Sequence, residues 1–108
     1  IVLNRNYKYT DRKLFYRNIM LDLPDIISNE ESEEFFKTIS YNVKRIRNEK
    51  GLSQLEVALS IGQKSSGFYA NTENYSHGKH FNLLHLLKLS KLFNIPIEEF
   101  FQPIEKKE

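Results

Sequence analysis

The sequence predicts an all-α protein, in which one compact domain of five short helices follows an N-terminal extension made of an arm and a helix. Apolar residues recur at helical spacing over residues 33–101, helix start and stop signals divide this stretch, and no alternating strand pattern interrupts it. A chain of 108 residues is the size of one ordinary domain. We therefore expect the extension at 1–32, the helical domain at 33–102 and a C-terminal tail at 103–108.

The first helix of the domain is predicted to be amphipathic and to run from Glu33 to Lys50. Its apolar residues follow one another at spacings of three, four and three, which places them on one face of a helix. They are Phe36, Ile39, Val43 and Ile46. Gly51 ends the helix, because glycine readily takes the left-handed conformation that often follows a last helical turn.

A second, short helix begins with a capping box. In the stretch Ser-Gln-Leu-Glu, Ser53 accepts hydrogen bonds from first-turn amides and Glu56 reaches back to the amide of Ser53. The helix then runs from about Gln54 to Gly62. A helix of this length is unstable alone, so we expect it to pack against its neighbours.

Ser65 or Ser66 caps a third predicted helix, which continues to about Asn74. It opens with two serines and a glycine and carries few apolar residues, whereas a helix that only builds a core carries three or four per two turns. Small residues allow close backbone approach, and hydroxyl and amide groups suit phosphates and base edges. The two short helices together predict a helix-turn-helix motif, whose second helix enters the major groove.

A loop and two more helices complete the predicted domain. Residues 75–81 contain a glycine and show no periodicity, which predicts a loop. Asn82 caps the next helix, and Asn94 can take the left-handed position at its end. The last helix starts at Pro96, where a missing N–H group costs nothing, and Pro103 ends it.

The extension is predicted to hold an arm and then a helix from about Asp11 to Leu21. The helix prediction rests on a capping residue and on four apolar residues, and Pro24 breaks the helix. These apolar residues are Leu14, Phe15, Ile19 and Met20. Because residue 1 is Ile rather than Met, we expect the chain to begin inside a longer product or after a processed start.

Charge is segregated along the chain, although its formal net charge is only +2. Residues 37–93 carry nine Lys or Arg and three Glu, whereas residues 21–36 carry six acids and no base. A basic block of this kind favours a polyanion as the partner. The apolar runs are much shorter than the roughly 20 residues that cross a bilayer. With no cysteine in the chain, these features predict a protein of the cytoplasm without a membrane partner.

Several motifs occur in an order that is more specific than a single helix-turn-helix match. They are RIRNEKGLSQ at 45–54, Ala58 and Gly62 in the first short helix, Glu73 at the end of the second, and LLKLSKLFNIPIEEFF at 86–101. Through them, residues 36–101 resemble the phage-repressor-like (Xre-type) helix-turn-helix domains of bacterial and phage transcription regulators. The resemblance implies a sequence-specific binder of double-stranded DNA, most simply a homodimeric repressor that needs no cofactor.

The resemblance also implies which residues touch DNA. Gln54 follows the capping serine and inherits a phosphate contact, and the helix at 65–74 reads bases. The base-reading positions are Lys64, Ser65, Ser66 and Gly67, with Phe68 and Asn71 on the same outward face. Lys64 and Lys79 add phosphate contacts, and Phe68 can touch a thymine methyl group. The resemblance assigns Arg47 and Glu73 to a partly buried ion pair rather than to DNA.

The chain departs from the family pattern in three places. One extra residue before Glu73 makes Tyr69 and Thr72 better inward positions than Phe68 and Asn71, so the register of the base-reading residues is open by one. The loop at 75–81 is about two residues longer than usual, and its basic side chains can reach the DNA backbone. These side chains are His77, Lys79 and His80. Finally, two leucines of the second helix replace charged or polar residues.

These leucines, Leu55 and Leu59, share one helix stripe because they are four residues apart. We expect them to be covered by the extension, through Leu14, Phe15 and Ile19, or by a partner subunit; scattered surface leucine is the alternative. A second function therefore stays open. In it, the chain is an antitoxin-like or other protein-interaction module that binds a partner through Leu55, Leu59 and the extension.

The sequence predicts neither a catalytic site nor a metal site. No nucleophile, base and orienting group form a recognisable motif, and no glycine-rich phosphate loop is present. His77, His80 and His85 have no acid or cysteine near them at ligand spacing, which favours loop residues or phosphate donors. The acidic run at 29–34 suits the dipole at a helix start better than it suits a mimic of nucleic acid or a site for a basic partner.

Overall fold

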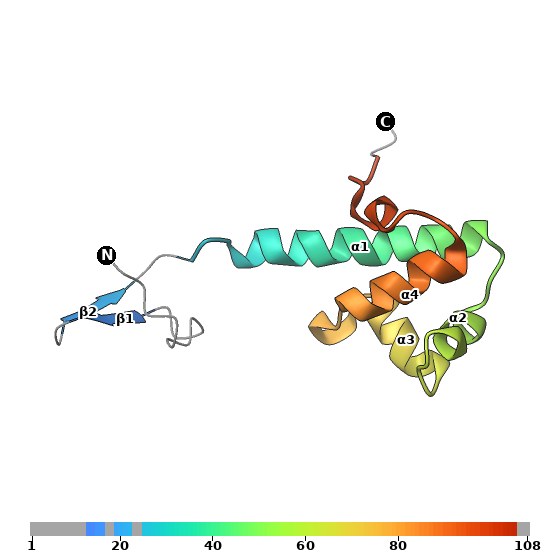
Figure 1. Cartoon of the computed structure of the whole chain (residues 1–108), viewed down its shortest axis with the longest axis horizontal. Coiled ribbons are helices and arrows are strands. Elements are labelled where there is room, and N and C mark those ends of the chain that lie inside the picture. Colours follow the sequence, from blue (N-terminus) through green and yellow to red (C-terminus); the bar gives the residue numbers. More distant parts are fainter. Residues whose placement is uncertain (1–12, 17–18, 23–24, 106–108) are drawn as a thin grey trace.

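The computed structural model of the chain describes residues 13–16, 19–22 and 25–105. This described part contains two strands, four α-helices and two 3₁₀ helices (Figure 1). They are β1 (Lys13–Tyr16), β2 (Ile19–Asp22), α1 (Asn29–Glu49), α2 (Gln54–Ser60), α3 (Ser66–Glu73), η2 (Ser76–Gly78), α4 (Leu83–Phe93) and η3 (Ile97–Phe101). The all-α class predicted for the domain is confirmed, although its fifth helix is the 3₁₀ helix η3 rather than an α-helix.

The predicted helix from Asp11 to Leu21 is wrong. Where that stretch is described, it forms β1 and β2, which pair as an antiparallel hairpin. The paired residues are Lys13 and Asp22, Leu14 and Leu21, Phe15 and Met20, and Tyr16 and Ile19. Two apolar runs with aromatic and β-branched members stand two residues apart here, a pattern that favours strands in a tight hairpin. The predicted arm at 1–10 and the break at Pro24 lie outside the described residues.

Helix α1 begins at Asn29 rather than at Glu33, within the stretch predicted as the extension. The hydroxyl oxygen of Ser28 accepts a hydrogen bond from the backbone N–H of Glu31 at 3.0 Å, which caps the helix. Acids in the first turn add to this stabilisation, because they face the positive end of the helix dipole. The predicted end is confirmed: α1 stops before Gly51, whose φ is +72°.

The predicted caps of α2 and α4 are confirmed. Ser53 accepts a hydrogen bond from the backbone of Glu56 at 3.0 Å, and the Glu56 carboxylate accepts one from the backbone of Ser53 at 3.2 Å. Asn82 caps α4 by accepting a first-turn N–H at 2.7 Å, and Asn94 ends that helix with φ 55°. Ser65 stands at the cap position of α3, but its hydroxyl makes no capping hydrogen bond.

One hydrophobic core joins the helices. Its largest fully buried apolar side chains are Val43, Val57, Tyr69, Leu86, Leu89, Phe93 and Phe100. Two buried polar side chains of α1 add specific links, since Ser40 donates to the carbonyl oxygen of Thr72 at 3.0 Å and Asn42 donates to those of Phe100 and Gln102 at 2.9 and 2.8 Å. α3 and η3 are therefore both fixed against α1.

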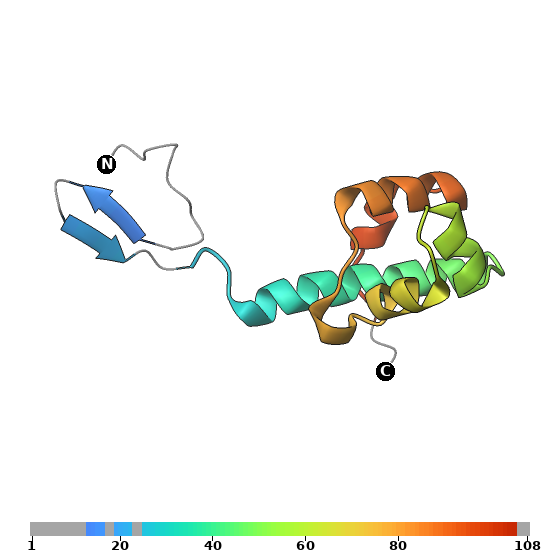
Figure 2. The ribbon, with the colours of Figure 1, turned by 90° about the horizontal axis from the view of Figure 1, so that it is seen from below.

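The long helix α1 separates two sides of the helical domain. α2 and α3 lie on one side of α1, and η3 with the C-terminal segment lies on the other (Figure 1). The hairpin lies beyond the N-terminal end of α1, at the opposite end of the molecule from α2 (Figure 2). Within the described ranges, no helix is both long enough and apolar enough to cross a membrane.

Candidate nucleic-acid interface

α2 and α3 form the predicted helix-turn-helix pair. The turn between them is a Schellman motif, in which the N–H of Gln63 bonds the carbonyl oxygen of Ala58 at 2.8 Å and that of Gly62 bonds Leu59 at 3.1 Å. Gly62 has φ +84°, a conformation that glycine takes without the strain of a β-carbon. The two helices share core residues, so the turn holds α3 at a fixed angle to α2.

α3 has a buried side and an exposed side. Tyr69, Thr72 and Glu73 are buried, whereas the side chain of Phe68 is 59% exposed. Tyr69 and Thr72 are therefore the inward positions, as expected from the extra residue before Glu73. The other predicted base-reading residues lie at the surface or half-buried beside it: Lys64 and Gly67 are exposed, and Ser65, Ser66 and Asn71 are half-buried.

A buried ion pair anchors the C-terminal end of α3. The guanidinium of Arg47 donates from Nε to Glu73 Oε2 and from Nη2 to Oε1, each at 2.9 Å, and from Nη1 to the carbonyl oxygen of Leu52 at 2.8 Å. The side chains of Arg47 and Glu73 are only 9% and 0% exposed. Bidentate pairing of this kind fixes direction as well as distance, so it sets where α3 lies on α1.

Ionisation within this cluster follows from burial and hydrogen bonding. Burial disfavours the charged carboxylate of Glu73, but the hydrogen bonds from Arg47 and Gln54 outweigh it and lower the pKa of Glu73. Burial, with the Glu73 carboxylate close by, raises the pKa of Tyr69. The buried Tyr69 hydroxyl makes no hydrogen bond of good geometry to any described residue. Glu73 is therefore charged and Tyr69 neutral at neutral pH.

Gln54, the predicted phosphate contact, is the first residue of α2 and is half-buried. Its Nε2 donates to Glu73 Oε1 at 3.3 Å, which places its side chain between the start of α2 and the end of α3. A primary amide carries two N–H donors, so one remains for a phosphate oxygen. The ion pair thus also orients Gln54.

Phe68 and Lys79 meet beside α3, a contact that sequence reasoning missed. The Lys79 ammonium lies over the Phe68 ring, 5.8 Å from its centroid, a cation–π geometry. Together with neighbouring residues they line a shallow hollow of about 450 Å³. Its lining residues are Gly62, Gln63, Lys64, Phe68, Thr72 and Lys79. The longer loop creates this contact, because Tyr75 and His77 adopt left-handed conformations with φ 56° that fold it back.

The surface around α3 presents positive charge. Residues 57–97 contain four lysines and a single acid, Glu73. Because Glu73 is buried and bonded to Arg47, its negative charge is not displayed to solvent. Two of the four lysines, Lys64 and Lys79, line the hollow next to Phe68. This side of the domain can therefore attract a polyanion such as the DNA backbone.

The three histidines do not form a metal site. Among the described residues, no group of three or more His, Cys, Asp or Glu side chains is arranged to hold an ion. The His80 ring stacks on Phe36, with centroids 3.8 Å apart, and its Nδ1 lies 3.1 Å from the carbonyl oxygen of Gly78. His85 completes the cap of α4, since its Nδ1 lies 3.4 Å from the backbone nitrogen of Asn82.

His85 predicts a dependence of stability on pH. Burial, and secondly the charge of Lys88, lower the pKa of His85 in the folded chain. The unfolded chain then binds more protons at this site, so acid favours unfolding as the pH falls through the ordinary histidine pKa of about 6.5 towards the lower folded value. We expect the melting temperature to drop less between pH 7.5 and pH 5.5 in His85→Gln, which keeps a capping acceptor, than in the wild type. An equal or larger drop in the variant would contradict the assignment.

The structure does not bring the leucines of α2 together with the extension. Leu55 and Leu59 are 51% and 57% exposed, and β1, which contains Leu14 and Phe15, lies at the opposite end of the molecule (Figure 2). Among the described residues the two leucines therefore stay open to solvent. A separate exposed apolar stripe lies on α4, at Leu83, Leu84 and Leu87.

Comparison with known proteins gives one match. A family model described as helix-turn-helix matches residues 43–100, which is more than half of the chain and includes α2, the turn and α3. The matched stretch begins within α1 and ends within η3, so it also includes all of α4. No curated protein and no solved structure matches the chain.

Proposed function

Because the chain belongs to the phage-repressor-like (Xre-type) helix-turn-helix family of DNA-binding transcription regulators, we propose that it is a dimeric repressor that reads duplex DNA with α3. The observation that supports this most strongly is the anchoring of α3. The Arg47–Glu73 pair and the core side chains hold one side of α3, which leaves the opposite, polar side outward. A rigid helix that presents few apolar side chains is what base reading in a major groove requires.

In the proposed complex, phosphate contacts set the position of the domain. Lys64 and Lys79 flank α3 and supply charge, and Gln54 supplies an amide donor at the start of α2. Contacts of this type fix register but carry no sequence information. The two lysines also account for an affinity that falls with salt, because each phosphate they neutralise releases condensed counterions.

Base reading falls to the first turns of α3. Ser65 and Ser66 can donate or accept hydrogen bonds, and the Asn71 amide can bond adenine in a bidentate way. Gly67 adds no side chain, which allows the backbone to come close. Phe68 offers an exposed ring for a thymine methyl group, and Lys79 above that ring joins this base contact to a phosphate contact.

Two copies on inverted half-sites would raise affinity and specificity. A single module of this size buries little surface, whereas a dimer reads two half-sites about 34 Å apart, which is one turn of DNA. Bound at a promoter in the cytoplasm, such a dimer represses transcription by occupying the site. Members of the family are typically not enzymes, and we propose no catalytic role.

The second candidate function is a protein-interaction module, which the exposed leucines favour. Leu55 and Leu59 lie four residues apart on α2 and have no cover among the described residues. As an antitoxin-like or other interaction module, the chain would bury them against a partner protein. Partner binding of this kind would be dominated by apolar contacts and would respond weakly to salt.

Salt dependence of DNA binding separates the two functions. We expect the affinity for duplex DNA to fall steeply with salt, and Lys64→Ala to reduce the slope of log K against log salt by about 1. Lys91→Ala on α4 is the matched control and should leave the slope unchanged. Titration of labelled duplexes at several salt concentrations measures this. Salt-insensitive behaviour, with a stoichiometric protein that co-purifies with the chain, would support the interaction module instead.

A further inference from the structure

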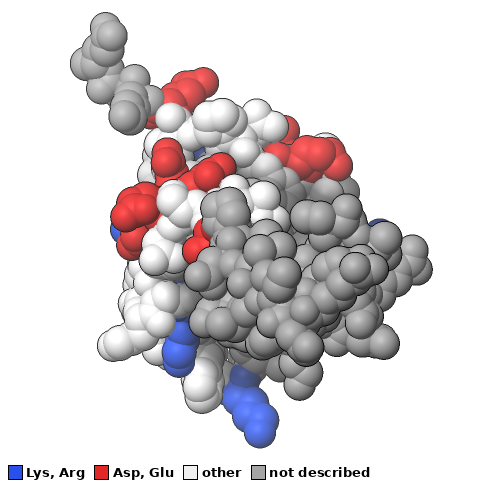
Figure 3. All heavy atoms as spheres, turned by 90° about the vertical axis from the view of Figure 1, so that its left-hand side faces the viewer, with Lys and Arg blue, Asp and Glu red and all other residues white. Residues whose placement is uncertain are grey.

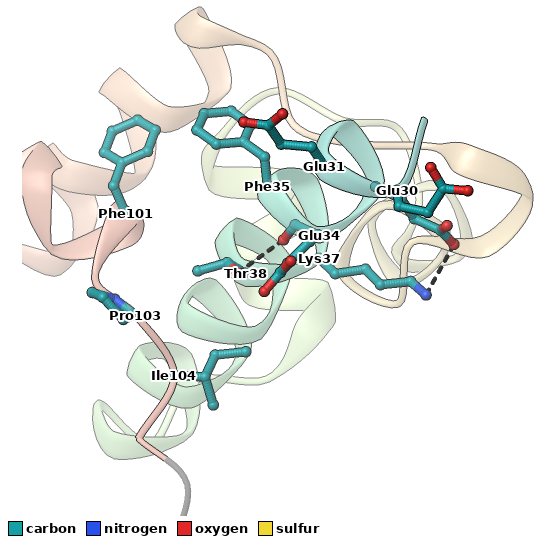
Figure 4. A pocket seen from close by; sticks show the side chains of 10 residues that line it. Glu30, Glu31, Glu34, Phe35, Lys37, Thr38, Phe101, Pro103 and Ile104 are labelled. Carbon is teal, nitrogen blue, oxygen red and sulfur yellow. Dashed lines mark hydrogen bonds and ion pairs between the residues drawn. The ribbon is translucent and has the colours of Figure 1, made fainter. Parts of the chain in front are cut away.

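An apolar groove lies open where the N-terminal half of α1 meets the C-terminal segment (Figure 4). It has a volume of about 690 Å³, and the rings of Phe35 and Phe101 stack in it with centroids 6.0 Å apart. Phe35, Phe101 and Ile104 are 50%, 38% and 39% exposed. Scattered apolar side chains are ordinary on a protein surface, but a contiguous aromatic floor indicates a binding surface.

The floor of this groove is rigid. Phe101 and Ile104 stand on a segment that Asn42 holds against α1 through its two hydrogen bonds to the carbonyl oxygens of Phe100 and Gln102. Phe35 also contacts Phe36 of α1 edge to face, at 5.5 Å between centroids. An occupant would therefore meet a preformed surface, which reduces the entropic cost of binding.

Four glutamates form a negative rim around the floor. They are Glu30, Glu31, Glu33 and Glu34. Of the four, only Glu33 makes an ion pair with a described residue, Lys37 at 2.9 Å. Figure 3 looks at this end of the molecule, and Asp and Glu side chains gather in the upper part of the visible face. The helix dipole accounts for acids in the first turn of α1 but not for Glu33 and Glu34 beyond it.

We propose that this groove binds the N-terminal segment, residues 1–22, of a second copy of the chain. The groove needs an occupant that is both basic and apolar, because its floor is aromatic and its rim is acidic. Residues 1–20 carry five Lys or Arg and one Asp, and they include several aromatic and aliphatic residues. Opposite charges on the two surfaces favour their encounter and disfavour wrong partners.

The hairpin gives an independent reason for a second copy. β1 and β2 have four residues each, and a hairpin of two short strands is only marginally stable alone in water. It lies beyond the N-terminal end of α1 (Figure 1), and none of its residues lines the groove of its own chain. The groove is open, and two copies related by a two-fold axis can each insert its segment into the groove of the other.

The size of such an exchange suits a stable dimer. A standard interface takes about 20–30 residues from each partner. In the exchange, each chain contributes both its residues 1–22 and its groove residues to the interface. Together these residues reach that range. η3 and the C-terminal segment, which supply Phe101, Pro103 and Ile104 to the groove, lie on the opposite side of α1 from α3 (Figure 1), so both recognition helices stay free. The inference therefore goes beyond DNA reading and does not depend on it.

Charge reversal tests the exchange. We expect sedimentation to show a dimer for the wild-type chain, and a dimer dissociation constant at least about 10-fold higher for Glu31→Lys/Glu34→Lys, because its groove and segment are then both positive. Arg5→Glu/Lys8→Glu should weaken the dimer similarly, because residues 1–20 then carry three bases and three acids and no longer attract the acidic rim. An equimolar mixture of the two variants should recover dimers, since the acidic groove of the second variant then meets the basic segment of the first.

A control variant and three contradicting outcomes complete the test of the exchange. Glu98→Lys/Glu99→Lys on η3 is the charge-matched control and should dimerise as the wild type does. A monomeric wild-type chain excludes the exchange. If either charge-reversal variant on its own dimerises as the wild type does, the interface lies elsewhere, such as on the leucines of α4. If the mixture of the two variants does not recover dimers, each groove binds the segment of its own chain. Binding of each variant to a single DNA half-site, measured separately, distinguishes failure of the exchange from failure of the proposed DNA reading.

Discussion

Arg47→Ala is expected to destabilise the helical domain by about 3–5 kcal/mol, the usual cost of leaving one member of a buried ion pair without its partner. The variant would lose two hydrogen bonds to Glu73 and one to the carbonyl oxygen of Leu52. Glu73, with 0% of its side chain exposed, would keep only the longer bond from Gln54. This loss is a large share of the 5–15 kcal/mol that typically stabilises a domain.

Thermal unfolding followed by circular dichroism measures the effect. Arg45→Ala is the matched control, because Arg45 also pairs with a glutamate at 2.9 Å, Glu49, but at the surface. Surface pairs are worth about 0–1 kcal/mol, so this variant should melt close to the wild type. An Arg47→Ala chain that melts like the wild type and yet fails to bind DNA would show that Arg47 acts on DNA rather than on Glu73.

Ser66→Glu is expected to weaken DNA binding by at least about 100-fold, roughly 3 kcal/mol, without unfolding the domain. Ser66 is the first residue of α3, where an added carboxylate suits the helix dipole and so should not disrupt the helix. The same carboxylate would face the DNA backbone, and its charge would oppose the phosphates if α3 enters the groove as proposed.

Fluorescence anisotropy with a labelled duplex, at one fixed salt concentration, measures this loss. The control is Ser32→Glu, which makes the same chemical change in α1, near the end of the domain that the hairpin adjoins. The control should bind DNA as tightly as the wild type. Equal binding by Ser66→Glu would show that the start of α3 does not approach DNA.

Much of the helical domain could be predicted because its boundaries depend on local chemistry. The capping box of Ser53 and Glu56, the cap at Asn82 and the left-handed Asn94 each need only neighbouring residues. Such signals are present in the sequence itself. The early start of α1 was not predicted, although Ser28 is an ordinary cap, because the apolar spacing of that helix begins later.

Other features depend on contacts that spacing does not reveal. The residues of the hairpin form two short apolar runs, in which spacing alone does not distinguish a strand from a short helix, although the aromatic and β-branched members favour strands. The contact of Lys79 with Phe68 arises from two left-handed residues in the loop, and no local pattern predicts that a loop folds back. The groove joins residues from both ends of the domain, so it exists only after folding.

Selection of binding sites from random duplex DNA tests most directly the claim that α3 reads sequence. The account predicts that the wild-type chain enriches an inverted repeat whose half-site centres lie one helical turn apart, about 34 Å. It further predicts that Asn71→Ala relaxes the preference at one base pair in each half-site and leaves the spacing unchanged. Recovery of unrelated sequences by the folded wild-type chain would contradict the account.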